Sequence, residues 1–285
     1  MIAGFIYRER AGRTMARQQP LVPARRLAAL AVAACATLHV SAAWAQATVG
    51  PGNVPAVGVF GTPTVVVGGT TITTSGTTPG AVAYSSTLTL DPSAGPSPGE
   101  IVVNAVNGIG LMAGSGALGT GIFVLPGGVR VAVSGNGTGM AAFSVGSLQA
   151  TDVDVTVIGG AGAQFGNGVV AQNGGTVGLA GASSITVNRH RVIALGASEA
   201  GSTLTATGTP AVTTSGVSDV GVYMHRGGTV ALPTGTTLNL NGKASNGLIV
   251  DATQGVTGPD ALTVSLPGSS GTSANSSKGV AASCA

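Results

Sequence analysis

The chain has 285 residues, of which 48 are glycine, 7% are charged and 3% are aromatic. Its hydrophobic residues are mostly Ala and Val, so it lacks the large side chains that fill the core of an ordinary helical domain. Small, β-branched and hydroxylated residues fit the pleated surface of thin β-layers. The composition therefore predicts an all-β fold and excludes an all-helical one.

The N-terminal segment concentrates the positive charge of the chain. Six of the 12 basic residues precede position 27, and an apolar run follows from Leu27 to Ala45. Together with the small residues Ala43 and Ala45, this pattern predicts a bacterial-type secretory signal over residues 1–45. Met15 opens a shorter, more conventional version of the leader, so Met1 and Met15 are both candidate start sites and we favour Met15.

Removal of this leader reverses the sign of the net charge. It takes away six Arg and Glu9, which leaves 6 basic and 8 acidic side chains and a net charge of −2. The exported part thus lacks the positive surface that phosphate binding requires, and we expect no nucleic-acid partner.

The two cysteines allow no disulfide in the exported chain. Cys35 lies in the leader, so only Cys284 remains after cleavage. Residues 32–35 also resemble a lipoprotein box, and cleavage before Cys35 would leave a lipid-anchored protein. The residues after Cys35 stay apolar instead of forming a polar tether, which favours the signal peptide.

Residues 46–99 form an N-terminal region rich in Gly, Thr and Pro. We expect short strands at Thr64–Val67, Thr70–Thr74 and Ser86–Leu90, where β-branched residues lie between turn residues. Three prolines in Asp91–Gly99 prevent a regular ladder, so this segment is predicted to be a loop or a boundary.

Residues 100–266 contain an internal repeat. Gly168–Asn188 returns 53 positions later as Gly221–Asn241, with eight of 21 positions identical, including a Gly-Gly-Thr-Val block. A related phrase occurs at Gly121–Val133, with shorter echoes at residues 192–206 and 247–251. Repetition of this kind predicts a β-solenoid, a parallel β-helix with roughly 20–30 residues per coil and about six to eight coils. A β-sandwich would have similar short strands but would not require the repeat.

The last segment, residues 267–285, is rich in Ser, Gly and Ala. It shows no alternation of apolar and polar residues. We expect a flexible tail without strands.

Three motif matches carry no chemistry. Gly95–Gly99 fits the G-x-S-x-G nucleophile elbow, but Pro98 lacks the N–H that the oxyanion hole needs. Gly114–Gly119 fits G-x-G-x-x-G, a match expected by chance in so glycine-rich a chain without a βαβ context. Gly159–Phe165 approaches a calcium-binding repeat but has Gln164 where a carboxylate is needed. We therefore expect no catalytic, cofactor-binding or metal-binding residues.

Two acids are the strongest catalytic candidates that remain. Asp152 and Asp154 lie on one face of an expected strand, with Val153, Val155 and Val157 on the other. Such a pair serves as general acid and base in some polysaccharide-cleaving enzymes. The simpler interpretation, which we favour, is a solvated Asp face opposite a Val core.

Two histidines lie in basic surroundings. His190 is flanked by Arg189 and Arg191, while His225-Arg226 replaces the Gln172-Asn173 of the other repeat copy. Both positions are near turns, so we expect solvated side chains, and two histidines without thiol partners do not predict a zinc site. They would be the first residues to change in a test of binding to anionic glycans or host surfaces.

With its leader, its Gly/Thr/Val/Asn-rich strands and its Gly-Gly-Thr-Val repeats, the chain resembles the N-terminal part of a pertactin-like autotransporter passenger from residue 46 to about residue 266. The resemblance implies a right-handed parallel β-helix that a C-terminal outer-membrane barrel carries to the cell surface. The chain stops at Ser283-Cys284-Ala285 without the alternating strands or terminal aromatic of such a barrel, so we expect a truncated product. As written, it would remain in the periplasm after crossing the inner membrane.

These features favour a non-enzymatic adhesion or host-interaction protein, displayed on the cell surface or secreted. Its expected partners are a host cell surface or matrix and, in an intact homologue, its own translocator barrel. No RGD or GDSGS motif supports the integrin-binding or proteolytic subtypes. Two alternatives stay open: a polysaccharide lyase or hydrolase that uses Asp152 and Asp154, and a non-functional remnant.

Overall fold

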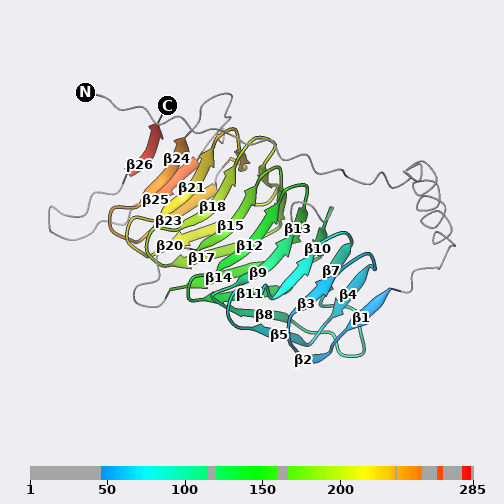
Figure 1. The fold of residues 1–285 in the computed structure, drawn as a ribbon. Coiled ribbons are helices and arrows are strands. Elements are labelled where there is room, and N and C mark those ends of the chain that lie inside the picture. Colours follow the sequence, from blue (N-terminus) through cyan, green and yellow to red (C-terminus); the bar gives the residue numbers. More distant parts are fainter. Residues whose placement is uncertain are drawn as a thin grey trace, which may run out of the picture. The chain divides into compact units, whose positions relative to one another are not determined.

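The computed structural model of the chain describes residues 46–114, 120–159, 166–234, 236–251, 262–265 and 278–283, the last two segments and Asp251 through their backbone alone. These residues form 26 strands and no helix. Every strand pairing is parallel, and the strands stack as successive coils (Figure 1). No helix in this part of the chain is long and apolar enough to cross a membrane.

Three parallel sheets, here called A, B and C, take the strands in rotation, so each coil contributes one strand to each sheet. Sheet A contains β1 (Ala47–Val49), β4 (Thr64–Val67), β7 (Thr87–Asp91), β10 (Ile122–Leu125), β13 (Ser147–Thr151), β16 (Thr176–Ala180), β19 (Thr203–Ala206) and β22 (Thr229–Ala231). Sheet B contains β2 (Gly52–Val54), β5 (Thr70–Thr74), β8 (Ile101–Val106), β11 (Val129–Ser134), β14 (Asp154–Ile158), β17 (Ser184–Asn188), β20 (Ala211–Thr214), β23 (Thr236–Leu240) and β25 (Leu262–Ser265). Sheet C contains β3 (Val57–Val59), β6 (Ala81–Ala83), β9 (Ile109–Ala113), β12 (Thr138–Phe143), β15 (Asn167–Gln172), β18 (Ile193–Ser198), β21 (Val220–His225), β24 (Asn246–Asp251) and β26 (Lys278–Ser283).

The 53-residue repeat corresponds to two coils. Val169 of the first copy pairs with Leu195, and Leu195 pairs with Val222 of the second copy. Coil length varies widely, from 17 residues between Ala47 and Thr64 to 35 between Leu88 and Phe123. The variation falls in the connections, so the strands keep their inward and outward alternation.

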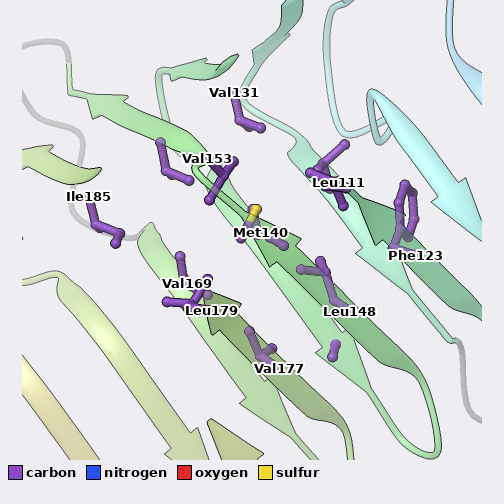
Figure 2. Close-up of a cluster of buried hydrophobic side chains, with 14 of the residues drawn as sticks. Leu111, Phe123, Val131, Met140, Leu148, Val153, Val169, Val177, Leu179 and Ile185 are labelled. Carbon is purple, nitrogen blue, oxygen red and sulfur yellow. The ribbon is translucent and has the colours of Figure 1, made fainter. Parts of the chain in front are cut away.

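The core is a set of apolar columns, one along the inner face of each sheet. In sheet A, fully buried Phe123 lies between Leu88 and Leu148 of the neighbouring coils. Figure 2 shows how side chains from the three sheets meet between the strands. Because each inward side chain contacts equivalents from the coils before and after it, the core stabilises neighbouring coils together.

Glycine occupies most positions of the column where the coils enter sheet C, although Ala194 takes this position between Gly168 and Gly221. Gly110 and Gly168 are examples, and a Cβ on Gly168 would lie 2.8 Å from Cγ2 of Ile185 in sheet B and 2.5 Å from the carbonyl oxygen of Ala194. The same crowding by a sheet B side chain and a backbone oxygen occurs at Gly80, Gly110, Gly139 and Gly221. A Cβ at these glycines would force neighbouring atoms to shift, and the first residue of each repeat copy belongs to this column.

The structure confirms the expected parallel β-solenoid and places several segments more closely. The coils extend N-terminal of residue 100, because β1–β7 belong to the same three sheets as the later strands. The loop Asp91–Gly99 joins sheet A to sheet B within one coil. In the tail expected to lack strands, Lys278–Ser283 pairs with β24. Residues 1–45 lie outside the described residues.

Candidate functional site

Asp152 and Asp154 do not form the expected pair on one strand face. Asp152 lies in the turn before β14 with φ of +47°, whereas Asp154 is the first residue of that strand. The Asp152 carboxylate accepts a hydrogen bond from the backbone N–H of Ala182, 2.6 Å away, and the Asp154 carboxylate accepts one from Oγ of Ser184 at 2.7 Å. Both acids therefore bind the following coil, while Val153, Val155 and Val157 are buried as expected.

Asp154 also belongs to a charged group on the outer face of sheet B. Arg130 lies 2.9 Å from Glu100 and 4.0 Å from Asp154, measured between nitrogen and carboxylate oxygen. Arg130 of β11 pairs in register with Asp154 of β14, and Glu100 reaches it from the residue that precedes β8. Asp154 thus contacts Arg130 and Ser184 on this outer face, away from Asp152.

Arg189 was expected to be solvated, and that expectation is wrong. The side chain is only 3% exposed and lies at the corner between sheets B and C. Its Nη1 donates to the carbonyl oxygen of Gly137 at 3.1 Å and its Nη2 to Oδ1 of Asn136 at 2.9 Å, both two coils earlier. Desolvation lowers the pKa of its guanidinium, and its Nε has no hydrogen-bond partner among the described residues. The residue therefore fills this corner instead of contacting solvent.

The same corner holds a buried acid that the sequence did not single out. Asp219 is fully buried, and its carboxylate accepts hydrogen bonds from the backbone N–H groups of Gly216 at 2.7 Å and Val192 at 3.4 Å. Burial raises its pKa to about 6, against the opposing effect of these bonds and of nearby His190. His190 itself is exposed, as expected, and its Nδ1 accepts a hydrogen bond from the backbone of Val217. The side chains of Asp219 and His190 thus hold this corner through hydrogen bonds from backbone N–H groups.

His225 and Arg226 lie at the corner between sheets C and A. Arg226 is exposed, and its guanidinium lies 3.5 Å from the carboxylate of Glu199 in the preceding coil. His225 is only partly exposed and stacks on Tyr223, with ring centroids 5.6 Å apart. His225 and Arg226, which replace Gln172 and Asn173 of the first copy, therefore each contact another side chain on the outer surface.

Strands of four consecutive coils build a hollow on the outer face of sheet A. It has a volume of about 290 Å³ and is lined by β10, β13, β16, β19 and residues next to them. Gly178 and Ala180 of β16 form its floor, because their side chains are the smallest of this part of the face. We call this hollow the sheet A trough.

The strand register builds the walls of the trough. Gln149 pairs with Gly178 on one side and Thr205 pairs with it on the other, so longer side chains flank the glycine from both neighbouring coils. Thr151 and Thr207 flank Ala180 in the same way, since Thr151 pairs with Ala180 and the N–H of Thr207 binds the carbonyl of Leu179. The trough therefore runs along β16, between walls roughly two strand spacings, or ~10 Å, apart.

The trough offers hydroxyl and amide groups and no charge among its described lining residues. Five threonines contribute to it: Thr151, Thr176, Thr203, Thr205 and Thr207. No described residue makes a hydrogen bond with these five hydroxyls. The Gln149 amide lies over Gly178 and overlaps the space that a Cβ would occupy, with its Oε1 only 2.0 Å from that position. Its Nε2 donates to Oγ of Ser147 at 3.3 Å.

A second hollow of about 440 Å³ adjoins the trough, because Pro126 lines both. Its other walls are Gly127, Gly128 and the loop that begins at Asp91. Hydrogen bonds from Ser93 lower the pKa of Asp91. This places the proline-rich loop, which the sequence suggested only as a boundary, at one end of the trough.

Sequence reasoning missed the trough, although the repeat contains a sign of it. Alignment of the two copies places Gly178 opposite Ala231, directly after the shared Gly-Gly-Thr-Val block. Because glycine has no side chain, the sheet surface is lower at Gly178 than at the equivalent Ala231. Two other motifs cannot be compared with the structure, because Gly114–Gly119 and Gly159–Phe165 lie outside the described residues except for their first glycine.

Comparisons with known proteins add no relative. No protein-family model matches the chain, and neither a curated protein nor a solved structure matches it significantly. Within the described part of the chain, no three His, Cys, Asp or Glu side chains are grouped so that they could hold a metal ion. The candidate site therefore rests on the geometry of the trough alone.

Proposed function

We propose that this chain is an exported, surface-displayed β-helical passenger that acts as a non-enzymatic binding protein towards a host cell surface or matrix. The observation that carries the proposal is the sheet A trough, an open hollow formed by four consecutive strands of one sheet with an uncharged lining. Concave sites with a few polar groups are the usual places for ligand binding.

The architecture supports display of such a site. A solenoid presents each strand as part of a continuous face, and each coil depends mainly on its neighbours for stability. Outward positions can therefore vary while the inward columns remain apolar, as the copies at Gly168–Asn188 and Gly221–Asn241 illustrate. The export step rests on the leader over residues 1–45.

Asp152 and Asp154 have structural roles between neighbouring coils. Each carboxylate is engaged by the following coil, and neither lines the trough. Incubation of the full-length chain with acidic polysaccharides should therefore release neither reducing ends nor unsaturated sugars. Release that disappears in Asp152→Asn would replace the binding role with a lyase or hydrolase.

The direct experiment measures binding of the purified full-length chain to cultured host cells and to immobilised extracellular matrix. Gly178→Thr should fill the trough and reduce binding at least tenfold, because its side chain occupies the floor. Ala231→Thr is the matched control, since it adds the same side chain to the same face one coil beyond Thr205 and outside the trough. Equal binding of both variants, or no binding by the parent chain, would contradict the proposal.

A further inference from the structure

We infer that the sheet A trough recognises a neutral glycan segment lying along β16. This inference rests on the proposed binding function and names the chemical class of its ligand. Four properties of the trough support it. Its described lining residues are uncharged, its walls carry hydroxyl groups, its floor is formed by small residues, and the backbone groups around it are already hydrogen-bonded between strands.

The walls offer groups that both donate and accept hydrogen bonds. Thr151, Thr205 and Thr207 flank the floor, and a threonine hydroxyl provides one donor and two acceptor positions. The Gln149 amide adds a carbonyl and an NH₂ group. Sugar hydroxyls have the same dual character, so a neutral saccharide can exchange bonds with either wall without leaving a charge unpaired.

The floor suits the apolar face of a sugar ring. Gly178 and Ala180 contribute only backbone and a methyl group, and Val124 and Pro126 extend this surface towards the second hollow. The exposed, flexible Gln149 amide lies over Gly178, so it must turn aside towards its own wall before a ring can reach the floor. A pyranose has apolar C–H faces and a polar rim. It can therefore rest its C–H face on the floor while its hydroxyls meet the walls.

An extended peptide fits this surface less well. Peptides that add to a sheet do so at an edge, where unpaired backbone groups supply the hydrogen bonds. At the trough the backbone is already paired, with β16 bonded to β13 on one side and to β19 on the other. An anionic glycan is disfavoured as well, since no described lining residue is a cation.

The difference between the repeat copies permits a clean test. Gly178 has no left-handed backbone conformation, and the atoms that a Cβ would meet belong to the flexible, exposed end of Gln149. A β-branched residue is therefore compatible with the strand, and Gly178→Thr should block the trough without unfolding the protein. Circular dichroism and thermal unfolding verify that the fold is retained.

The experiment titrates the full-length chain with neutral cello-, malto- and chito-oligosaccharides, with oligogalacturonate as the anionic probe and an uncharged extended peptide as the third. We expect saturable binding of at least one neutral oligosaccharide in the millimolar range, since a volume near 300 Å³ is at the low end for ligand sites. Gly178→Thr should weaken this binding at least tenfold and Gln149→Ala several-fold, while Ala231→Thr should equal the parent.

Three results would overturn the inference: no neutral oligosaccharide binds, binding is unchanged in Gly178→Thr, or only oligogalacturonate or the peptide binds. The outcome is separable from that of the proposed function. Cell binding that depends on Gly178 but is not competed by neutral oligosaccharides would contradict the glycan and leave the binding role intact. Oligosaccharide binding without any cell or matrix binding would leave the glycan inference and contradict the host-binding role.

Discussion

The two repeat copies, Gly168–Asn188 and Gly221–Asn241, occupy equivalent positions in coils that lie two apart, but they present different surfaces. Both begin in the glycine column of sheet C, cross a Gly-Gly turn into sheet A and end in sheet B. Their inward residues are equivalent and buried, as at Val177 and Val230. They differ at outward positions: Gly178 forms the trough floor in one copy, where Ala231 continues the sheet face in the other.

The comparison shows that scaffold and surface vary independently in this fold. Positions that face the core or the crowded corner are restricted by contacts with neighbouring coils. An outward side chain contacts mainly the outward side chains of the neighbouring strands in its sheet. A single substitution there can therefore open or close a site.

The coil between the copies should matter most for stability. Leu195 is fully buried between Val169 and Val222, so Leu195→Ala should leave a cavity that contacts both copies. We expect the free energy of unfolding to fall by about 2–5 kcal/mol. Urea unfolding of the full-length chain measures the loss, and hydrogen exchange should accelerate in both copies. Protection lost in one copy alone would show that the coils are not coupled as proposed.

The second copy is preceded by buried Asp219, whereas the equivalent residue before the first copy is Gly166. The folded pKa of Asp219, about 6, lies above its unfolded value of 3.8, so its stabilising contribution is complete below pH 3.8 and is lost as the pH rises through 6. We expect the free energy of unfolding to fall by about 2–3 kcal/mol between pH 4 and pH 7 on this account.

Unfolding curves of the parent chain and of Asp219→Asn across this pH range provide the measurement. The difference between the two should change with pH in the stated direction, because other titrating groups are common to both. The other ionisable side chains on the segments bonded at this corner, His190, Arg189, Arg191 and Lys243, are unchanged in the variant. A difference that is independent of pH would contradict the role of Asp219.

The outward turn that distinguishes the copies should matter least for stability. Arg226 occupies the position of Asn173, and both have left-handed backbone conformations, with φ of +46° and +52°. Its ion pair with Glu199 joins side chains that are 64% and 39% exposed, so Arg226→Asn should change the free energy of unfolding by no more than about 0.5 kcal/mol. Urea unfolding at low and high salt checks this, and a loss above about 1 kcal/mol would show a structural role for the turn.

Much of the fold could be predicted because its signals are local. Thr64–Val67 and Thr70–Thr74 have the expected bounds, since β-branched runs between turn residues need no distant contact to be recognised. The phrase at Gly121–Val133 shows the limit of this reasoning. It joins sheets A and B, whereas the similar phrases at Gly168 and Gly221 join sheets C and A. Gly-Gly turns serve more than one corner, and the sequence around a turn does not say which.

The candidate site could not be predicted, because it depends on contacts between residues of different coils that lie far apart in the sequence. Arg189 looks like an ordinary turn residue, yet it binds Asn136 and Gly137 more than 50 positions earlier because two coils bring that corner beneath it. The trough likewise needs Gln149, Gly178 and Thr205 to lie side by side, which connections of unequal length bring about.

The sequence by itself determined the short strands, because alternation and turn chemistry act between neighbouring residues, and its 53-residue repeat indicated that these strands stack in coils. Only the tertiary structure decided which outward side chains meet, since that depends on the register between coils and therefore on the length of every connection. The trough, the buried Asp219 and the engaged Asp152 and Asp154 are all consequences of that register.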